Sequence, residues 1–196
     1  SCSERRLERR KNNYAEVVEW ASKNNIPANS DYVIIGKYDC TTQNLECRLT
    51  IDEVKNLIDE KISLDIRYLK NIKEDAEKKE RANPDDFICS VCNSSICISE
   101  SGNVYPCAGW QNYVVGNMNE TSLNEIWNKS AAVRFLRGLR KRDFPKCIQC
   151  ADAAFCTMCM VRNANESKTG NMLEINEYFC NIAKYNKEKC FEQYSA

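Results

Sequence analysis

The amino-acid sequence predicts an α+β fold, in which a small hairpin-and-helix domain follows a βα fragment made of helix, strand and helix. Apolar residues recur at helical spacing through most of the first 80 residues, and one short apolar run that ends at Gly36 interrupts them. Beyond the segment RANPDD the apolar stretches are shorter, and nine of the thirteen cysteines lie between Cys89 and Cys180. This change predicts two domains, residues 1–82 and residues 86–196.

The first domain should contain helical segments on either side of one strand. Residues 4–24 have the spacing of an amphipathic helix, and the run DYVIIGKY, residues 31–38, predicts a buried strand. Thr50 and Glu53 have the spacing of a capping box, so a second helix should begin after Thr50 and continue to about Lys79. A single strand of this kind cannot close a parallel barrel, and the fragment has the pattern of the last part of one.

The second domain should begin with a β-hairpin. The stretch SICISESGNVYPC alternates around a turn, with Gly102 at positive φ. Ser122 should cap a short helix over LNEIWNKS, and helices are expected over residues 130–142 and in the C-terminal tail. The large side chains expected in the core are Trp110, Trp127 and Phe135.

The charge balance excludes several classes of partner. The chain has 28 basic and 28 acidic residues, divided 16 to 17 over residues 1–85 and 12 to 11 over residues 86–196. This balance argues against nucleic acid or an anionic membrane as the partner. No apolar run approaches the ~20 residues that span a bilayer, and SCSERRLERRKNN is not a signal peptide, so we expect a cytoplasmic protein. The basic residues between Arg134 and Arg142 should form a solvated helix face, with a docking patch for an acidic partner as the alternative.

The cysteines indicate metal binding. Their number is odd and they are clustered in a protein without secretion features, which favours metal over disulfides. The chain has no histidine, so mixed Cys/His zinc sites and Rieske centres are excluded. The spacing C-x2-C-x5-C-x2-C begins at Cys147. Together with the upstream and downstream cysteines it provides two four-thiolate sites, a number that suits two zinc ions or two [4Fe–4S] clusters. The candidate cysteines are Cys89, Cys92, Cys97, Cys107, Cys147, Cys150, Cys156, Cys159 and Cys180.

The sequence motifs around these cysteines are similar to those of a known family. The segments SGNVYPC and VGNMNETSLNEIW precede the four-cysteine stretch. Twelve residues separate Cys89 from Gly102, and four separate Gly102 from Cys107. Together these motifs resemble the SPASM domain, the C-terminal auxiliary-cluster module of radical SAM enzymes that modify peptides and proteins. The resemblance covers about residues 86–185. Upstream, the segment from DYVIIGKYDC to CRLTIDEVKNLI resembles the end of a partial (β/α) radical SAM barrel.

The resemblance implies two ligand sets for two [4Fe–4S] auxiliary clusters. The first set is Cys89, Cys92, Cys107 and Cys159. The second set is Cys147, Cys150, Cys156 and Cys180. Cys97 competes with Cys92 for a place in the first set, and the C-x2-C spacing with Cys89 favours Cys92. The family usually ends the four-cysteine stretch with C-x3-C, whereas this chain has C-x2-C before Cys159.

The radical SAM signature C-x3-C-x2-C does not occur in these 196 residues. The resemblance therefore implies that S-adenosylmethionine and a third [4Fe–4S] cluster bind to an N-terminal part outside this chain. We expect the fragment alone to be inactive, and the sequence identifies no catalytic residue in it.

The function implied is that of a radical SAM maturase, a SAM-dependent oxidoreductase that crosslinks, epimerises or oxidises a residue of a ribosomally made peptide or protein. Its auxiliary clusters would transfer electrons and position the substrate. The partners implied are a peptide or protein substrate and a reductant such as flavodoxin or ferredoxin, with no nucleic acid and no membrane. The alternative from the cysteine chemistry is a non-enzymatic zinc-binding structural or interaction module, because zinc binds the same thiolates.

Overall fold

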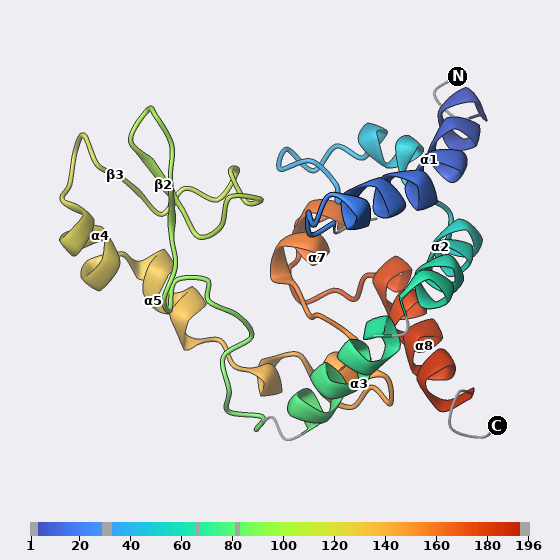
Figure 1. Ribbon diagram of the computed structural model, residues 1–196. Helices are drawn as coiled ribbons and strands as arrows, with labels where there is room; N and C mark the ends of the chain where they lie inside the picture. Colours follow the sequence, from blue (N-terminus) through green and yellow to red (C-terminus); the bar gives the residue numbers. More distant parts are fainter. Residues whose placement is uncertain (1–3, 29–32, 66, 81–82, 193–196) are drawn as a thin grey trace.

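The computed structural model describes residues 4–28, 33–65, 67–80 and 83–192, and it is a mixed α and β structure with one small sheet (Figure 1). This confirms the α+β class. The α-helices are α1 Glu4–Lys23, α2 Ile51–Leu64, α3 Arg67–Glu80, α4 Leu123–Lys129, α5 Ala131–Gly138, α6 Pro145–Ile148, α7 Met160–Glu166 and α8 Glu177–Glu192. The strands are β1 Cys97–Ile98, β2 Asn103–Tyr105 and β3 Gly116–Asn117, and the 3-10 helices are η1 Gln43–Cys47, η2 Lys141–Asp143 and η3 Ala153–Phe155.

The strand predicted over residues 31–38 is wrong for its described part, residues 33–38; residues 31 and 32 lie outside the described residues. Gly36 is held by side chains of α7 instead of a neighbouring strand. Its N–H donates to Glu166 Oε1 at 3.2 Å, and its carbonyl accepts from Asn165 Nδ2 at 3.1 Å. A Cβ on Gly36 would lie 2.8 Å from the Asn165 carbonyl oxygen, so this close approach requires glycine.

The partial barrel is not confirmed, because the three strands of the described residues form one antiparallel sheet in the order β1-β2-β3. An apolar run becomes a strand only when another strand supplies hydrogen bonds, and residues 33–38 have no such neighbour within the described part of the chain.

The predicted capping box is confirmed at the start of α2. Thr50 Oγ1 accepts from the Glu53 N–H at 3.3 Å, and Glu53 Oε2 accepts from the Thr50 N–H at 2.9 Å. Helical character continues to Glu80, in agreement with the prediction to about Lys79, but it is divided between two helices, because α2 ends at Leu64 with Asp65 as its C-cap. The Asp65 carboxylate accepts from the backbone N–H of Arg67 at 2.9 Å, and this local bond turns the chain into a second helix, α3.

The C-terminal helix α8 packs against α2 and α3 (Figure 1). Its Phe179 and Ile182 form a small core with Val54 and Ile58 of α2. Helix α3 also contacts η3, which lies in the middle of the cysteine-rich segment. These contacts cross the boundary predicted between residues 82 and 86, which itself stays a prediction.

A second core lies between the hairpin and the helices that follow it. The predicted hairpin forms, with Cys97 paired to Tyr105, and Gly102 has φ +80° as expected. Ser122 Oγ accepts from the Glu125 N–H at 3.3 Å and caps α4. The buried members of this core include Val104, Trp110, Ile126, Val133, Leu136 and Phe144.

The core prediction holds for Trp110, fails for Phe135 and is intermediate for Trp127. Helix α5 turns Val133 and Leu136 inward, so Phe135 faces solvent and is 55% exposed. Trp127 is partly buried under the guanidinium of Arg137, which lies 4.5 Å from its ring centre.

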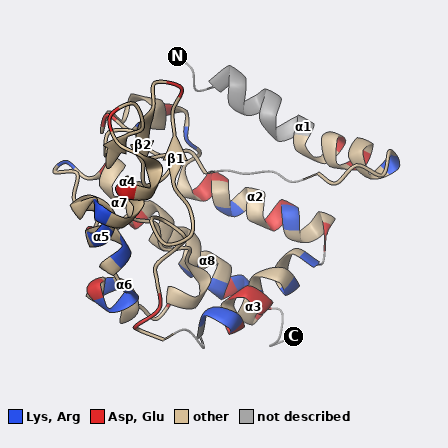
Figure 2. Cartoon of the chain, turned by 90° about the vertical axis from the view of Figure 1, so that its left-hand side faces the viewer, with Lys and Arg blue, Asp and Glu red and all other residues tan. Residues whose placement is uncertain are grey.

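Figure 2 shows basic residues along α5 and near α6. The predicted solvated face is confirmed for Arg134, which is exposed, but the basic side chains of the segment from Arg137 to Arg142 contact other parts of the molecule. The Arg137 guanidinium donates to the carbonyl oxygens of Cys92 at 2.7 Å and Trp127 at 2.8 Å. The other basic side chains of this segment hold residues 85–87: Arg140 lies over the Phe87 ring, Lys141 pairs with Asp86 and Arg142 pairs with Asp85. Most of the basic side chains of this segment therefore form hydrogen bonds, ion pairs or ring contacts within the molecule.

No helix in the described part of the chain is long and apolar enough to cross a membrane.

Candidate metal centre

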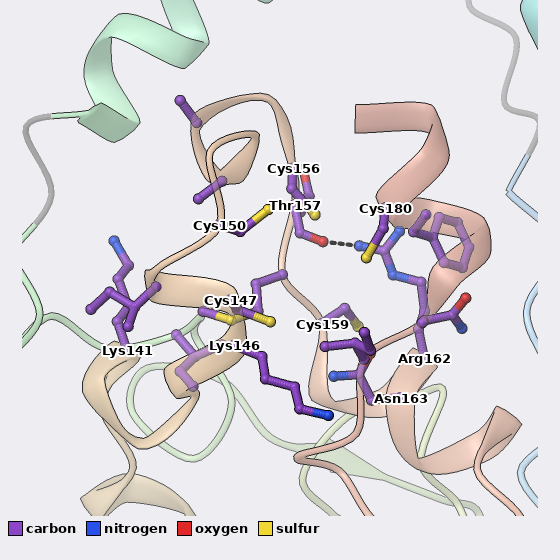
Figure 3. A pocket seen from close by; sticks show the side chains of 18 of the residues that line it. Lys141, Lys146, Cys147, Cys150, Cys156, Thr157, Cys159, Arg162, Asn163 and Cys180 are labelled. Atoms are coloured by element: carbon purple, nitrogen blue, oxygen red, sulfur yellow. Dashed lines mark hydrogen bonds between the residues drawn. The ribbon is translucent and has the colours of Figure 1, made fainter. Parts of the chain in front are cut away.

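Four cysteines from separate segments line one cavity of about 640 Å³. Cys147 lies on α6, Cys150 follows that helix, Cys156 ends η3, and Cys180 lies in the first turn of α8. Figure 3 shows their side chains pointing into the same space. The fold therefore brings together the whole second set of predicted ligands, which we call the second thiol site.

The thiols of the second thiol site are close enough to change one another's proton affinity. Burial is the largest cause that raises the pKa of Cys147, Cys156 and Cys180, and the pKa of Cys180 reaches about 11. Each pair among the four, Cys150 included, also interacts through charge, which raises these pKa values further. A bound metal centre would offset this mutual repulsion, because metal ions bind cysteines in their thiolate form and stabilise that negative charge.

Two cations border the second thiol site. Arg162 on α7 lies with its guanidinium 4.0 Å from the Phe179 ring centre, and it donates to the Thr157 carbonyl oxygen. Lys79 Nζ on α3 donates to the Cys156 carbonyl oxygen at 3.3 Å. Both positive charges act to lower the pKa of Cys156, against the larger effect of burial. The site therefore combines four thiols with nearby positive charge that offsets an anionic occupant.

The first set of predicted ligands gathers around Cys89. Burial raises the pKa of the Cys89 thiol, and the nearby thiolates of Cys159 and Cys107 raise it further. The charge of Cys89 in turn raises the pKa of Cys92, for which burial is again the largest cause. Cys89 is thus within electrostatic reach of the other three members, and we call this group the first thiol site.

Local backbone geometry distinguishes Cys92 from Cys97. Cys92 is fully buried in a turn, with φ +54°, and the Arg137 guanidinium fixes its carbonyl oxygen. Cys97 lies on β1, where its backbone pairs with Tyr105. The thiol that interacts with Cys89 in the described structure is Cys92, in agreement with the C-x2-C spacing.

Cys159 lies between the two sites. It is the N-cap residue of α7, with an extended backbone at φ −143° and ψ 112°, and it also lines the cavity of the second thiol site. Its charge acts on Cys89 of the first thiol site. The short C-x2-C spacing therefore leaves Cys159 within reach of its predicted partner, only three positions after Cys156.

The donor sets suit an iron–sulfur cluster. All the candidate ligands are cysteines, which are soft donors, and the second thiol site lines a partly open cavity with cations at its border. The twelve described cysteines are all free of disulfides, as expected for ligands. Among the described residues, no three Cys, Asp or Glu side chains converge closely enough to hold a metal ion as they stand.

Comparison with known proteins identifies the domain that contains these sites. Residues 89–160 match the family model of SPASM, an iron–sulfur cluster-binding domain. These residues are therefore similar to a domain that binds iron–sulfur clusters and is found in radical SAM enzymes. No curated protein and no solved structure matches the chain. The match includes every cysteine of the two sites except Cys180, which α8 supplies.

Sequence reasoning missed three residues that border the second thiol site, Lys79, Arg162 and Asn176. Arg162 stands three positions after Cys159, a spacing that puts both on one face of a helix, so its place could have been predicted. Asn176 is the second residue of the segment INEYFCNIAKYNKEKCFEQY predicted as a helix, whereas α8 begins at Glu177 and leaves Asn176 at the N-cap position, for which asparagine is a recognisable signal. Lys79 carries no such signal, because it reaches the site only through the packing of α3 on η3.

Proposed function

We propose that this chain is the auxiliary-cluster region of a radical SAM maturase and that it binds two [4Fe–4S] clusters. The first thiol site would hold one cluster through Cys89, Cys92, Cys107 and Cys159. The second thiol site would hold the other through Cys147, Cys150, Cys156 and Cys180. The segment that binds S-adenosylmethionine and the third cluster would be supplied by sequence outside this chain.

The observation that carries the proposal is the arrangement of the second thiol site. Four thiols from α6, η3, α8 and the loop after α6 line one cavity and interact with one another through charge. Three of them come from the segment that matches the SPASM domain, and Cys180 joins them from the helix beyond that segment. Packing alone provides no reason for four thiols, whose charged forms would repel one another, to lie around one space.

In this proposal the clusters supply one-electron redox chemistry, and the protein supplies their ligands and surroundings. The eight cysteine side chains would bind the two clusters, and Arg162 and Lys79 would offset the negative charge of the cluster at the second thiol site. Each ligand set also closes long loops of the chain. Cys89 and Cys159 are seventy positions apart and Cys147 and Cys180 are thirty-three apart, so cluster binding contributes directly to folding.

The substrate would be a side chain of a ribosomally made peptide or a protein, and electrons would come from a reductant such as flavodoxin or ferredoxin in the cytoplasm. The charge balance of the chain and its internally paired basic segment support a small redox or peptide partner over nucleic acid.

The test is the content of iron and acid-labile sulfide after anaerobic reconstitution of the full chain. Two [4Fe–4S] clusters require about eight irons and eight sulfides per chain. The variant Cys180→Ala should lower both values to about four. Its matched control is Cys190→Ala, which removes a thiol of the same helix that is buried against α3, with Sγ 4.0 Å from the Leu69 carbonyl oxygen, and that variant should keep the wild-type content.

A second pair of variants tests the first thiol site. Cys92→Ala should lose one cluster, whereas Cys97→Ala should retain both, since Cys92 is the thiol that interacts with Cys89. One or two zinc ions without sulfide, even after reconstitution, would instead support a zinc-binding interaction module and overturn the proposed electron-transfer role.

A further inference from the structure

The second thiol site contains a hydrogen-bond donor without a partner. Asn176 lies directly before α8, and its carbonyl oxygen accepts from the N–H groups of Phe179 and Cys180, both at 3.1 Å. These backbone bonds fix the first turn of the helix. The side-chain Nδ2 of Asn176 is buried, and it has no hydrogen-bond partner within the described structure. Asn176 also lines the cavity of the second thiol site.

A buried amide N–H normally has an acceptor, because leaving it unpaired costs about 1–3 kcal/mol. The cavity that Asn176 lines is also lined by the sulfur-bearing side chains of the second thiol site. Thiolate and sulfide sulfurs accept hydrogen bonds, and a cluster bound by these cysteines would bring several of them into the cavity. A cluster at this site would therefore supply the acceptor that the buried Asn176 Nδ2 lacks within the described structure.

Positively charged side chains also line the same cavity. Arg162 is held over the Phe179 ring and against the Thr157 carbonyl oxygen, so its guanidinium is fixed at the edge of the site. Lys79 is fixed in the same way by the Cys156 carbonyl oxygen.

We propose that Asn176 donates a hydrogen bond to a sulfur of the cluster at the second thiol site and that this bond, with the charge of Arg162, raises the reduction potential of that cluster. The inference rests on the proposed function, since it concerns the same cluster. One electron added to a thiolate-bound cluster makes it more negative, and N–H donors and cations stabilise the more negative state. Asn176 is therefore a residue that tunes the cluster.

The test is a redox titration of the reconstituted full chain, with dithionite as the electron source and absorbance and electron paramagnetic resonance as readouts. Asn176→Asp has the same shape, keeps a favourable N-cap residue and removes the donor. Asn176→Ser also keeps the cap and removes the donor without adding charge. The matched control is Asn181→Asp, because Asn181 lies on the same helix, is exposed, and donates only to the Glu177 carbonyl oxygen at 2.8 Å.

We expect one of the two midpoint potentials to fall in both Asn176 variants, while the other midpoint and the iron content stay unchanged. For Asn176→Asp the ratio of reduced to oxidised cluster at a fixed potential should fall about tenfold, which corresponds to about 59 mV for a one-electron couple. For Asn176→Ser it should fall about threefold, because only the difference in hydrogen-bond strength between the two redox states is lost. Asn181→Asp should match the wild type.

Three results would overturn the inference, and they are distinguishable. Equal midpoints in the Asn176 variants and in Asn181→Asp, with full iron content, would exclude the hydrogen bond and leave the proposed function intact. Loss of iron from both Asn176 variants, with Asn181→Asp fully loaded, would make Asn176 necessary for holding the cluster and exclude a tuning role. A wild-type chain without iron and sulfide would overturn the proposed function and the inference together.

Discussion

The ion pair between Arg48 and Glu166 predicts a large loss of stability when one partner is removed. Arg48 follows η1, and Glu166 is the last residue of α7, so the pair joins the first part of the chain to the SPASM-containing part. The Arg48 Nη1 lies 2.8 and 2.9 Å from the two carboxylate oxygens, and the side chains are only 13% and 11% exposed. The guanidinium also lies 3.8 Å from the centre of the Tyr178 ring.

Arg48→Met keeps most of the aliphatic volume and leaves the Glu166 carboxylate buried without its cation. Breaking a buried pair in this way costs about 3–5 kcal/mol. The Gly36 N–H continues to donate to Glu166, so we expect the lower part of that range. For a chain of this length, 1 kcal/mol lowers Tm by roughly 2–4 °C, and the expected loss is therefore about 6–12 °C for a cost near 3 kcal/mol.

The assay is thermal unfolding of the reconstituted chain, followed by circular dichroism. Arg67→Met is the matched control, because Arg67 also pairs with a carboxylate, Asp65, through two nitrogens, but that pair is exposed to solvent. The control should change Tm little, since solvent screens such pairs. The double variant Arg48→Met/Glu166→Gln should recover part of the loss, because it removes the unpaired charge. Equal Tm values for Arg48→Met and Arg67→Met would refute the reasoning that the pair is buried.

Three further predictions concern single sites. Thr50→Ala removes the hydroxyl that accepts from the Glu53 N–H and should destabilise the chain by about 1 kcal/mol in urea unfolding; an unchanged midpoint would contradict the capping box. Gly102→Ala should cost about 1–3 kcal/mol by the same measurement, because φ is +80° and the new Cβ would lie 2.7 Å from Asn119 Nδ2. Burial raises the pKa of Cys190, so at pH 8 less of it is thiolate and iodoacetamide should label it more slowly than the exposed Cys40, with a rate that rises with pH. Peptide mass spectrometry gives both labelling rates, and equal rates in the folded chain would contradict the burial of Cys190.

Local signals in the sequence predicted the elements that depend on local chemistry. The capping boxes and caps at Thr50 and Ser122 and the positive φ of Gly102 each involve residues within a few positions of one another. The strand at residues 31–38 failed for the opposite reason. Its apolar residues match a strand pattern, but a strand forms only where a neighbouring strand supplies hydrogen bonds. The backbone of Gly36 instead forms hydrogen bonds with side chains of α7.

For the candidate site, too, local sequence signals predicted some residues, and residues brought in by long-range packing were missed. The number and clustering of the cysteines were enough to propose two four-thiolate sites. The division of these cysteines into two ligand sets came from the resemblance to the SPASM domain. Lys79 became visible only when α3 was seen to pack on η3, since no short-range pattern relates Lys79 to the cysteines of the second thiol site. Phe135 was misplaced because a basic, amphipathic stretch does not reveal which of its apolar residues faces inward.

The position of Cys159 has a consequence for the order of assembly. Under the proposed assignment, Cys156 and Cys159 bind different clusters and only Thr157 and Met158 separate them. Whichever cluster is inserted first restricts this short connection and removes conformations that the second insertion would otherwise have to exclude. Loading of one site should therefore favour loading of the other, and a variant that loses one cluster should hold the remaining cluster less tightly.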